Sequence, residues 1–389
     1  MSVVAPAGFV AAGVACGIKD GGAPDLALVA TDDGRPVPAA GVFTRNLVAA
    51  APVVVSRRHL ERTGGTAAAV VLSSGNANAG TGARGEADAE RMCELVGREL
   101  SAPAEAVLVC STGLIGFPLP MDRVEAGIPA LVAARGGEAA HATAAARAIM
   151  TTDTRTKQTL VEGPGFTVGG VAKGAAMLAP DMATMLAVLT TDAAVDPPAL
   201  RTALRAGVAD SFNAVSVDGC TSTNDTVLLL ASGRAGRPAP EAFAAAVAEA
   251  CLDLALQMVR DAEGHTKVVT VRVTGAASDE EARRAARKVA DSQLVKCSWF
   301  GADPYWGRVA SDLGTAGVAL DPAALTIAYG GTVVSRGCAP VDHDAAAVAA
   351  HMAGEEIDLH CDLGVGTGQA RVFTNDLTYG YIDENKGTS

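Results

Sequence analysis

Thr184 lies between the small residue Ala183 and Met185 near the middle of a 389-residue chain, and Lys173 lies eleven residues upstream. The six histidines do not stand beside a serine, threonine or cysteine in a recognisable nucleophile motif, so a hydroxyl nucleophile here would need another base. A threonine that becomes an N-terminus supplies one, because its free α-amine has a pKa of about 7.7–8.0 and can activate the hydroxyl. Such chemistry requires the chain to be cut just before the threonine.

Four polar loops that follow apolar runs are further candidates for a site, because a strand fixes the position of the loop at its end. Each of them taken singly is better explained as a simple turn, since Gly, Ser, Asn and Thr are turn formers. Their number, together with Thr184 and Lys173, favours a catalytic site. The loops are Ser73–Asn76, Ser111–Gly113, Thr151–Asp153 and Asp218–Thr226.

Other kinds of site fit the sequence less well. The glycine-rich stretches 163–170 and 364–370 lack the Walker spacing, which argues against a nucleotide cradle. The run of His343, His351, His360 and Cys361 fits no common zinc pattern, so no metal site is expected.

The composition describes a globular protein without features of a nucleic-acid or membrane partner. Apolar residues make up 49% of the chain, and the net charge of -12 argues against phosphate binding. The N-terminus has no basic region typical of a signal peptide, and the long uncharged run 63–83 is too rich in Gly, Ser, Asn and Thr for a membrane helix. Eight cysteines without a C-x-x-C motif suit a reducing compartment. We therefore expect a cytoplasmic protein.

Hydrophobic periodicity predicts alternating strands and helices, and hence a layered α/β or α+β fold without a clean linker. The Ser278–Glu281 pair predicts a capping box at the start of one helix. The predicted helices are 86–100, 138–150, 241–264 and 278–295, and the predicted strands begin at 67 and 106 and cover 267–276, 325–335, 357–364 and 368–377.

The chain closely resembles the glutamate N-acetyltransferase family, also called the ornithine acetyltransferases of arginine biosynthesis. The resemblance covers nearly the whole sequence and rests on many motifs in order. They are GVFTRN, SSGNANA, CSTGLIG, AIMTTDT, GGVAKGAAMLAPDMATMLAVLTTDA, STNDTVLLLASG, DAEG, SQLVKC, DPYWGR and DLTYGYIDEN.

The resemblance implies that the precursor cuts itself between Ala183 and Thr184. It would give an α segment of residues 1–183 and a β segment of 184–389, the latter with a C-terminal α/β region from about residue 240. Thr184 would then be the N-terminal nucleophile, and two α and two β segments would assemble into a heterotetramer. The implied fold is that of the ornithine acetyltransferases and β-aminopeptidases.

The resemblance also implies roles for individual residues. Thr112 and Gly113 would form the oxyanion hole, where a hydroxyl and a backbone N–H stabilise developing negative charge. The tail looks one residue short, so its last hydroxyl ligand would be either Thr388 or Ser389. The implied substrate-binding residues are Thr151, Thr152, Lys173, Thr184, Glu263 and Asn385 together with that tail hydroxyl.

The implied reaction moves an acetyl group from N²-acetylornithine to glutamate through an acetyl-Thr184 intermediate. No cofactor is implied, and the sequence leaves open whether acetyl-CoA is also a donor. The alternatives are an autocleaving aminopeptidase or amidase of related fold, a secondary-metabolism paralogue, and a binding protein that keeps the fold without catalysis.

Overall fold

The computed structural model describes residues 2–177, 179 and 185–387, which form two compact units. The first unit comprises residues 1–213 and 220–258, and the second comprises 214–219 and 259–389. The second unit thus differs from the expected C-terminal region starting near residue 240, because helix α6 (Pro240–Val259) packs with the first unit up to Met258. The predicted cleavage position between Ala183 and Thr184 lies outside the described residues.

The first unit contains a four-stranded sheet and a six-stranded sheet. In the four-stranded sheet β5 and β6 run parallel, whereas the other pairs are antiparallel. Its strands, in spatial order, are β1 (Phe9–Val14), β2 (Leu26–Thr31), β5 (Ala69–Asn76) and β6 (Val107–Leu114). The six-stranded sheet runs β4 (Thr66–Ala67), β3 (Val37–Phe43), β10 (Thr226–Ala231), β9 (Leu186–Thr191), β8 (Phe166–Lys173) and β7 (Lys157–Gly163).

The two sheets pack face to face, because their strands carry apolar residues on both faces. On β5, Val70 and Leu72 join the core between the sheets with Val188 and Leu228 of the second sheet. The alternate residue Val71 faces the outer helices instead. This alternation places a core on each side of the four-stranded sheet.

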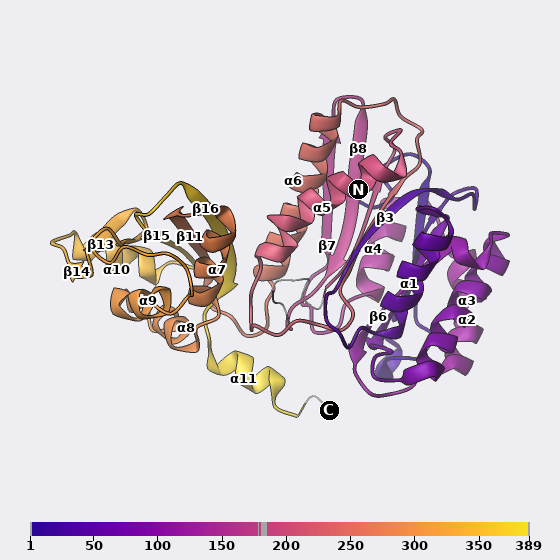
Figure 1. The fold of residues 1–389 in the computed structure, drawn as a ribbon. Coiled ribbons are helices and arrows are strands. Elements are labelled where there is room, and N and C mark those ends of the chain that lie inside the picture. The colour runs from indigo at the N-terminus through magenta and orange to yellow at the C-terminus, as the bar shows by residue number, and fades with distance from the viewer. Residues whose placement is uncertain (1, 178, 180–184, 388–389) are drawn as a thin grey trace. The chain divides into compact units, whose positions relative to one another are not determined.

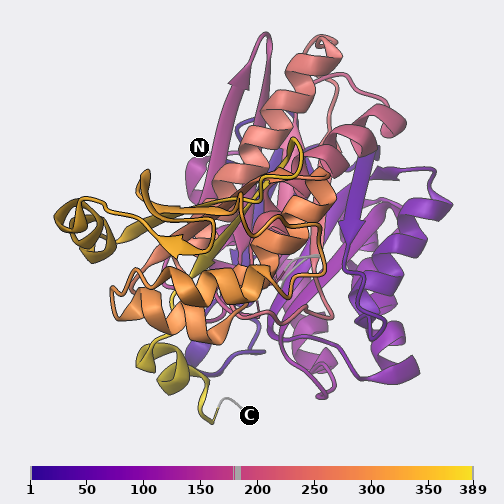
Figure 2. The same cartoon turned by 60° about the vertical axis from the view of Figure 1, so that its left-hand side comes forward.

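Helices cover the outer faces and make the unit four layers deep (Figure 1). The helices α2 (Gly82–Leu100) and α3 (Met121–Ala133) cover the four-stranded sheet. The helices α5 (Pro197–Ala209) and α6 cover the six-stranded sheet, where the rings of Phe166 and Phe243 lie 5.8 Å apart. Figure 2 shows the same layers from another side, with the strands between the two groups of helices. The other α-helices described in this unit are α1 (Ala51–Arg62) and α4 (Ala139–Ala148).

The second unit has one six-stranded sheet packed on helices around the buried aromatic residues Trp299 and Tyr329. The strands, in spatial order, are β14 (Ala339–Pro340), β13 (Thr332–Arg336), β12 (Thr326–Tyr329), β15 (Glu356–Asp362), β11 (Val268–Ala276) and β16 (Gly368–Asn375). The helices are α7 (Asp279–Ala290), α8 (Gln293–Phe300), α9 (Trp306–Leu313), α10 (Ala345–Ala353) and α11 (Tyr379–Asn385).

The layered α/β fold predicted from the sequence is confirmed, with three local corrections. The predicted helix 278–295 is two helices, because Ser292 starts a new one by accepting a hydrogen bond from Val295 N. The predicted strand 325–335 is a hairpin that turns at Gly330 and Gly331, both with positive φ. The long helix 241–264 ends at Val259.

Among the described residues one helix, α6, is long and apolar enough to cross a membrane. Half of its apolar window is buried inside the structure, and Val247, Cys251 and Leu254 are fully enclosed. This pattern is that of a core helix with one face on the sheet.

Candidate active site

The predicted oxyanion residues lie at the end of β6, where it runs parallel to β5. Thr112 pairs in register with Ser74, and Gly113 pairs with Gly75. Gly113 has a φ of +134°, and a Cβ there would lie 2.3 Å from the carbonyl carbon of Gly75. Only glycine therefore fits this position, so the tight approach of the two strand ends accounts for the glycine in the sequence.

Lys173 ends β8 on the other sheet and brings the predicted residues together. Its side chain is buried, and its Nζ donates hydrogen bonds to Thr112 Oγ1 at 3.2 Å and to Thr151 Oγ1 at 2.8 Å. An ammonium can only donate, so both threonine oxygens accept from Lys173 and each hydroxyl proton must point elsewhere. Lys173 thus turns the Thr112 hydroxyl proton away from itself, so that this hydroxyl can donate a hydrogen bond to another group.

Thr151 and Thr152 differ in this arrangement. Thr151 bonds to Lys173 through its hydroxyl and to Asp153 Oδ2 through its backbone N–H, at 3.0 Å. Thr152 is exposed, and its hydroxyl has no hydrogen bond among the described residues. Of the two predicted threonines, the structure connects Thr151 to the lysine.

A buried ion pair between Lys157 and Asp153 supports the turn at Thr151 and was not foreseen from the sequence. Asp153 Oδ1 accepts from Lys157 Nζ at 2.6 Å and from the backbone N–H of Gly174 at 2.7 Å. Burial alone would raise the pKa of Asp153, but the charges of Lys173 and Lys157 outweigh it and hold the pKa at about 2. The ionised carboxylate therefore fixes both the Thr151 turn and the residue after Lys173. The only sequence signal was the aspartate in AIMTTDT.

The residue that follows Thr184 is held at the start of β9. Ala183 and Thr184 themselves lie outside the described residues, but Met185 N–H donates to Asp225 Oδ1 at 3.0 Å and Met185 O accepts from Thr226 N at 3.2 Å. Both backbone groups of Met185 are thus bonded to the start of β10. Asp225 is fully enclosed, and burial raises its pKa well above the ordinary value while the bond from Met185 opposes the shift.

The loop before β10 connects this point to the oxyanion strand. Asn224 Nδ2 donates to Ala77 O at 2.6 Å and to Ser111 O at 2.8 Å, at the ends of β5 and β6. Asn224 and Asp225 therefore link the start of β9 to the residue before Thr112. The sequence pointed to this loop as a polar candidate but gave Asp225 no role.

In the second unit, the predicted residues Glu263 and Asn385 contact each other. Asn385 Nδ2 donates to Glu263 Oε2 at 2.7 Å and to Tyr381 O at 2.9 Å.

Glu263 lines a pocket of about 170 Å³. Asp218, Asp291, Lys296, Asn375, Asp376 and Tyr381 also line it. Burial lowers the pKa of Lys296 to about 8 although nearby carboxylates oppose the shift. The tail residues Thr388 and Ser389 lie outside the described residues.

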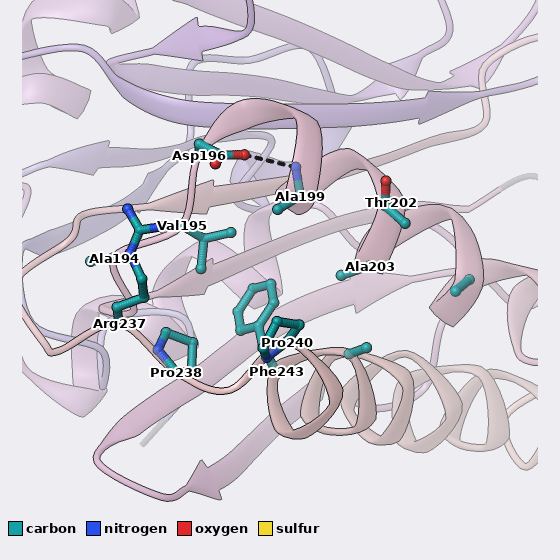
Figure 3. A pocket seen from close by; sticks show the side chains of 12 residues that line it. Ala194, Val195, Asp196, Ala199, Thr202, Ala203, Arg237, Pro238, Pro240 and Phe243 are labelled. Carbon is teal, nitrogen blue, oxygen red and sulfur yellow. Dashed lines mark hydrogen bonds between the residues drawn. The ribbon is translucent and has the colours of Figure 1, made fainter.

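An apolar pocket of about 300 Å³ between α5 and α6 is a different feature (Figure 3). Its walls include Phe243, Pro238 and Pro240, and Asp196 at its edge caps α5 by accepting from Ala199 N at 3.0 Å. None of the predicted site residues lines it. The bonds of Lys173 to Thr112 and Thr151 lie instead where the strand ends of the two sheets of the first unit meet.

A family model described as "ArgJ family" matches residues 10–387. The chain belongs to the ArgJ family.

The curated relatives of this ArgJ chain match it from end to end. The arginine biosynthesis bifunctional protein ArgJ of Mycolicibacterium paratuberculosis is 50% identical over 400 residues, which cover all of this chain and 96% of that protein. The protein of the same name from Streptomyces avermitilis is 48% identical, with full coverage of both. The solved structure of ornithine acetyltransferase from Mycobacterium tuberculosis, in complex with ornithine, is 46% identical over 46% of this chain and 94% of its own, with a TM-score of 0.42.

The family predicted from the sequence motifs is therefore confirmed, and with it the expected class of enzyme, an acetyltransferase of arginine biosynthesis. The roles given to individual residues, Thr184 included, stay predictions.

Proposed function

We propose that this ArgJ chain transfers the acetyl group of N²-acetylornithine to glutamate, with Thr184 as the nucleophile. The observation that carries the proposal is the hydrogen bonding of Lys173 to both Thr112 and Thr151 at the end of the oxyanion strand. The bonds between Met185 and the start of β10 support it, because they fix the residue covalently attached to Thr184.

The first step is self-cleavage of the precursor. The Thr184 hydroxyl attacks the carbonyl of Ala183, its proton passes to the Thr184 nitrogen, and the peptide bond breaks as an ester forms. Water then hydrolyses the ester and leaves residues 1–183, residues 184–389 and a free α-amine on Thr184. That amine is the base of the mature enzyme, since its ordinary pKa of about 7.7–8.0 leaves part of it unprotonated near neutral pH.

Acetyl transfer follows in two halves. Thr184 Oγ attacks the acetyl carbonyl of N²-acetylornithine while the α-amine takes the hydroxyl proton. The oxyanion lies between the Thr112 hydroxyl and Gly113 N–H. As the C–N bond breaks, the α-ammonium returns the proton to the amine of the leaving ornithine. The amine of glutamate then attacks acetyl-Thr184, gives up one proton through the same base and leaves as N-acetylglutamate.

The charges of the described residues suit these substrates. Lys173 provides the positive charge for a substrate carboxylate beside the oxyanion strand. Glu263 provides a carboxylate suited to the side-chain ammonium of ornithine. Asn385 would orient Glu263 through the 2.7 Å bond to its Oε2.

We infer further that the reaction uses no cofactor. The relatives' names describe a bifunctional protein, and we propose acetyl-CoA as the alternative acetyl donor of a second activity. The α and β segments would remain together as a heterotetramer in the cytoplasm. A glutamate-free reaction of the chain with acetyl-CoA would acetylate Thr184 if acetyl-CoA enters the same route.

The test measures ornithine released from N²-acetylornithine with and without glutamate, using Thr184→Ala as the control. The proposal predicts that sustained ornithine release requires glutamate and that N-acetylglutamate forms in equal amount. The Thr184→Ala variant should remain one chain and release nothing. Equal rates without glutamate would instead identify an amidase that gives the acetyl group to water.

A further inference from the structure

A second lysine, Lys19, lies beside the Lys173 cluster and has no part in the scheme above. Its loop is folded around the buried carboxylate of Asp25. That carboxylate accepts backbone N–H bonds from Cys16 at 2.7 Å and from Gly17 and Lys19 at 3.0 Å each. Three backbone donors on one buried carboxylate make a rigid support, so the start of the Lys19 side chain is fixed.

The Lys19 side chain extends across the end of β5 toward the Thr151 turn. Its Cγ lies so close to Gly75 that a Cβ there would be 2.9 Å from it, and Gly75 pairs in register with the oxyanion residue Gly113. Its Nζ donates to Met150 O at 2.6 Å, directly before Thr151, and to Pro24 O at 2.9 Å. The described residues thus use two of the three donors of this ammonium.

The charges of Lys19 and Lys173 are close enough to affect each other. Burial lowers the pKa of Lys19, and repulsion from Lys173 lowers it further, while Asp25 and Asp153 act in the opposite direction. With Lys157 included, three ammonium groups stand against these two carboxylates, and burial raises the pKa of the third nearby carboxyl group, Asp225, which favours its neutral form. This end of the first unit therefore has an excess of positive charge, which is suited to an anionic ligand.

The two substrates of the proposed reaction differ in their negative charge. N²-acetylornithine has one carboxylate and a cationic side chain, whereas glutamate has two carboxylates. Lys173 serves one carboxylate in either case, so glutamate brings a second one that needs its own cation. We propose that Lys19 binds the side-chain carboxylate of the acceptor glutamate and so sets the acceptor specificity of this site. The inference rests on the proposed acetyl transfer.

The test separates this role from mere support of the Thr151 turn, which Lys19 also contacts. Lys19→Gln removes the charge, and Lys19→Arg retains it. Lys267→Gln is the matched control, because Lys267 Nζ likewise donates to two backbone carbonyls, Ala353 O at 3.1 Å and Gly354 O at 2.7 Å. All variants are first checked for self-cleavage by mass and for thermal stability.

The readout is the KM for each substrate, together with the preference for glutamate over glutamine, which lacks the side-chain carboxylate. Loss of a charge-assisted hydrogen bond is expected to raise the KM for glutamate roughly tenfold or more in Lys19→Gln. The KM for N²-acetylornithine should change by less than about threefold, because that substrate does not use the bond. Lys19→Gln should also lose most of the preference for glutamate over glutamine, and Lys19→Arg should restore part of it.

A turn-support role would raise the KM for both substrates alike and leave the glutamate preference intact, and that result would overturn the inference. If the wild-type enzyme itself transfers no acetyl group to glutamate, the proposed function fails before Lys19 is tested. The two failures are therefore distinguishable in one set of assays.

Discussion

Lys173 Nζ donates a hydrogen bond to Thr112 Oγ1 at 3.2 Å, so the last residue of β8 sets the direction of a hydroxyl on a strand of the other sheet. The bond joins residues 61 positions apart. It exists only because the two sheets of the first unit pack face to face with these strand ends adjacent. The proposed oxyanion hole therefore depends on the packing of the sheets as well as on the CSTGLIG motif.

Replacing Lys173 with methionine should impair substrate binding more than self-cleavage. Methionine has a similar length but cannot donate to Thr112 or Thr151 or attract a carboxylate. We expect kcat/KM for N²-acetylornithine to fall about tenfold to a hundredfold, the scale of one or two charge-assisted hydrogen bonds. Steady-state kinetics on the cleaved variant would measure this, and an unchanged KM would argue against carboxylate binding by Lys173.

Replacing Thr112 with valine tests the oxyanion role. Valine keeps the branched shape but has no hydroxyl, and loss of one such donor costs about 10²–10³ in kcat. Thr112→Ser is the matched control because it retains the hydroxyl and should recover most of the rate. Equal activity of the valine and serine variants would show that the hydroxyl does not stabilise the transition state.

Asp225 is expected to be required for a stable start of β9. Asp225→Ala leaves the buried Met185 N–H without its acceptor, which costs about 1–3 kcal/mol of unfolding free energy. Asp225→Asn keeps an oxygen acceptor and should be closer to wild type. Denaturant unfolding and the rate of self-cleavage should both follow the order wild type, Asn, Ala. A cleavage rate unaffected by alanine would contradict the view that Met185 positions Thr184.

Asp153 should make the free energy of unfolding depend on pH in the acid range. Its folded pKa of about 2 lies below the ordinary value of 3.8, so its contribution to stability is present above pH 3.8 and is lost as the pH falls through 2. Asp153→Asn should reduce this acid dependence. It should also lower the unfolding free energy by about 3–5 kcal/mol, because Lys157 would be left buried without its carboxylate.

Unfolding curves between pH 7 and pH 2 would measure both effects. Arg272→Gln is a suitable control, because it disturbs only the exposed ion pair with Asp358 and exposed pairs contribute about 0–1 kcal/mol. An Asp153→Asn variant as stable as this control would mean that the buried pair adds little.

Local sequence patterns were sufficient for the family and for many of the elements. The strand that begins at 67 and the helix 86–100 follow from hydrophobic periodicity. Of the predicted capping box only one half forms, because Ser278 accepts from Glu281 N while the Glu281 carboxylate accepts from Ala319 N. The break between α7 and α8 was missed because Ser292 starts a helix without interrupting the helical composition.

The support of the site could not be predicted for a different reason. Asp25, Asp153 and Asp225 are ordinary polar residues in their local sequence, and their roles arise from backbone groups that the fold brings to them. Lys19 reaches the carbonyl of Met150 across 131 positions of the chain. Residue spacing contains no signal for contacts of this kind.

The proposed mechanism requires the chain to cut itself before Thr184 and to carry the acetyl group on that residue. The most direct measurement is the intact mass of the purified protein before and after N²-acetylornithine is added, and again after glutamate. The account predicts fragments of residues 1–183 and 184–389, one acetyl group gained by the second fragment, and its loss when glutamate is supplied. A single uncut chain that gains no acetyl group would contradict the account.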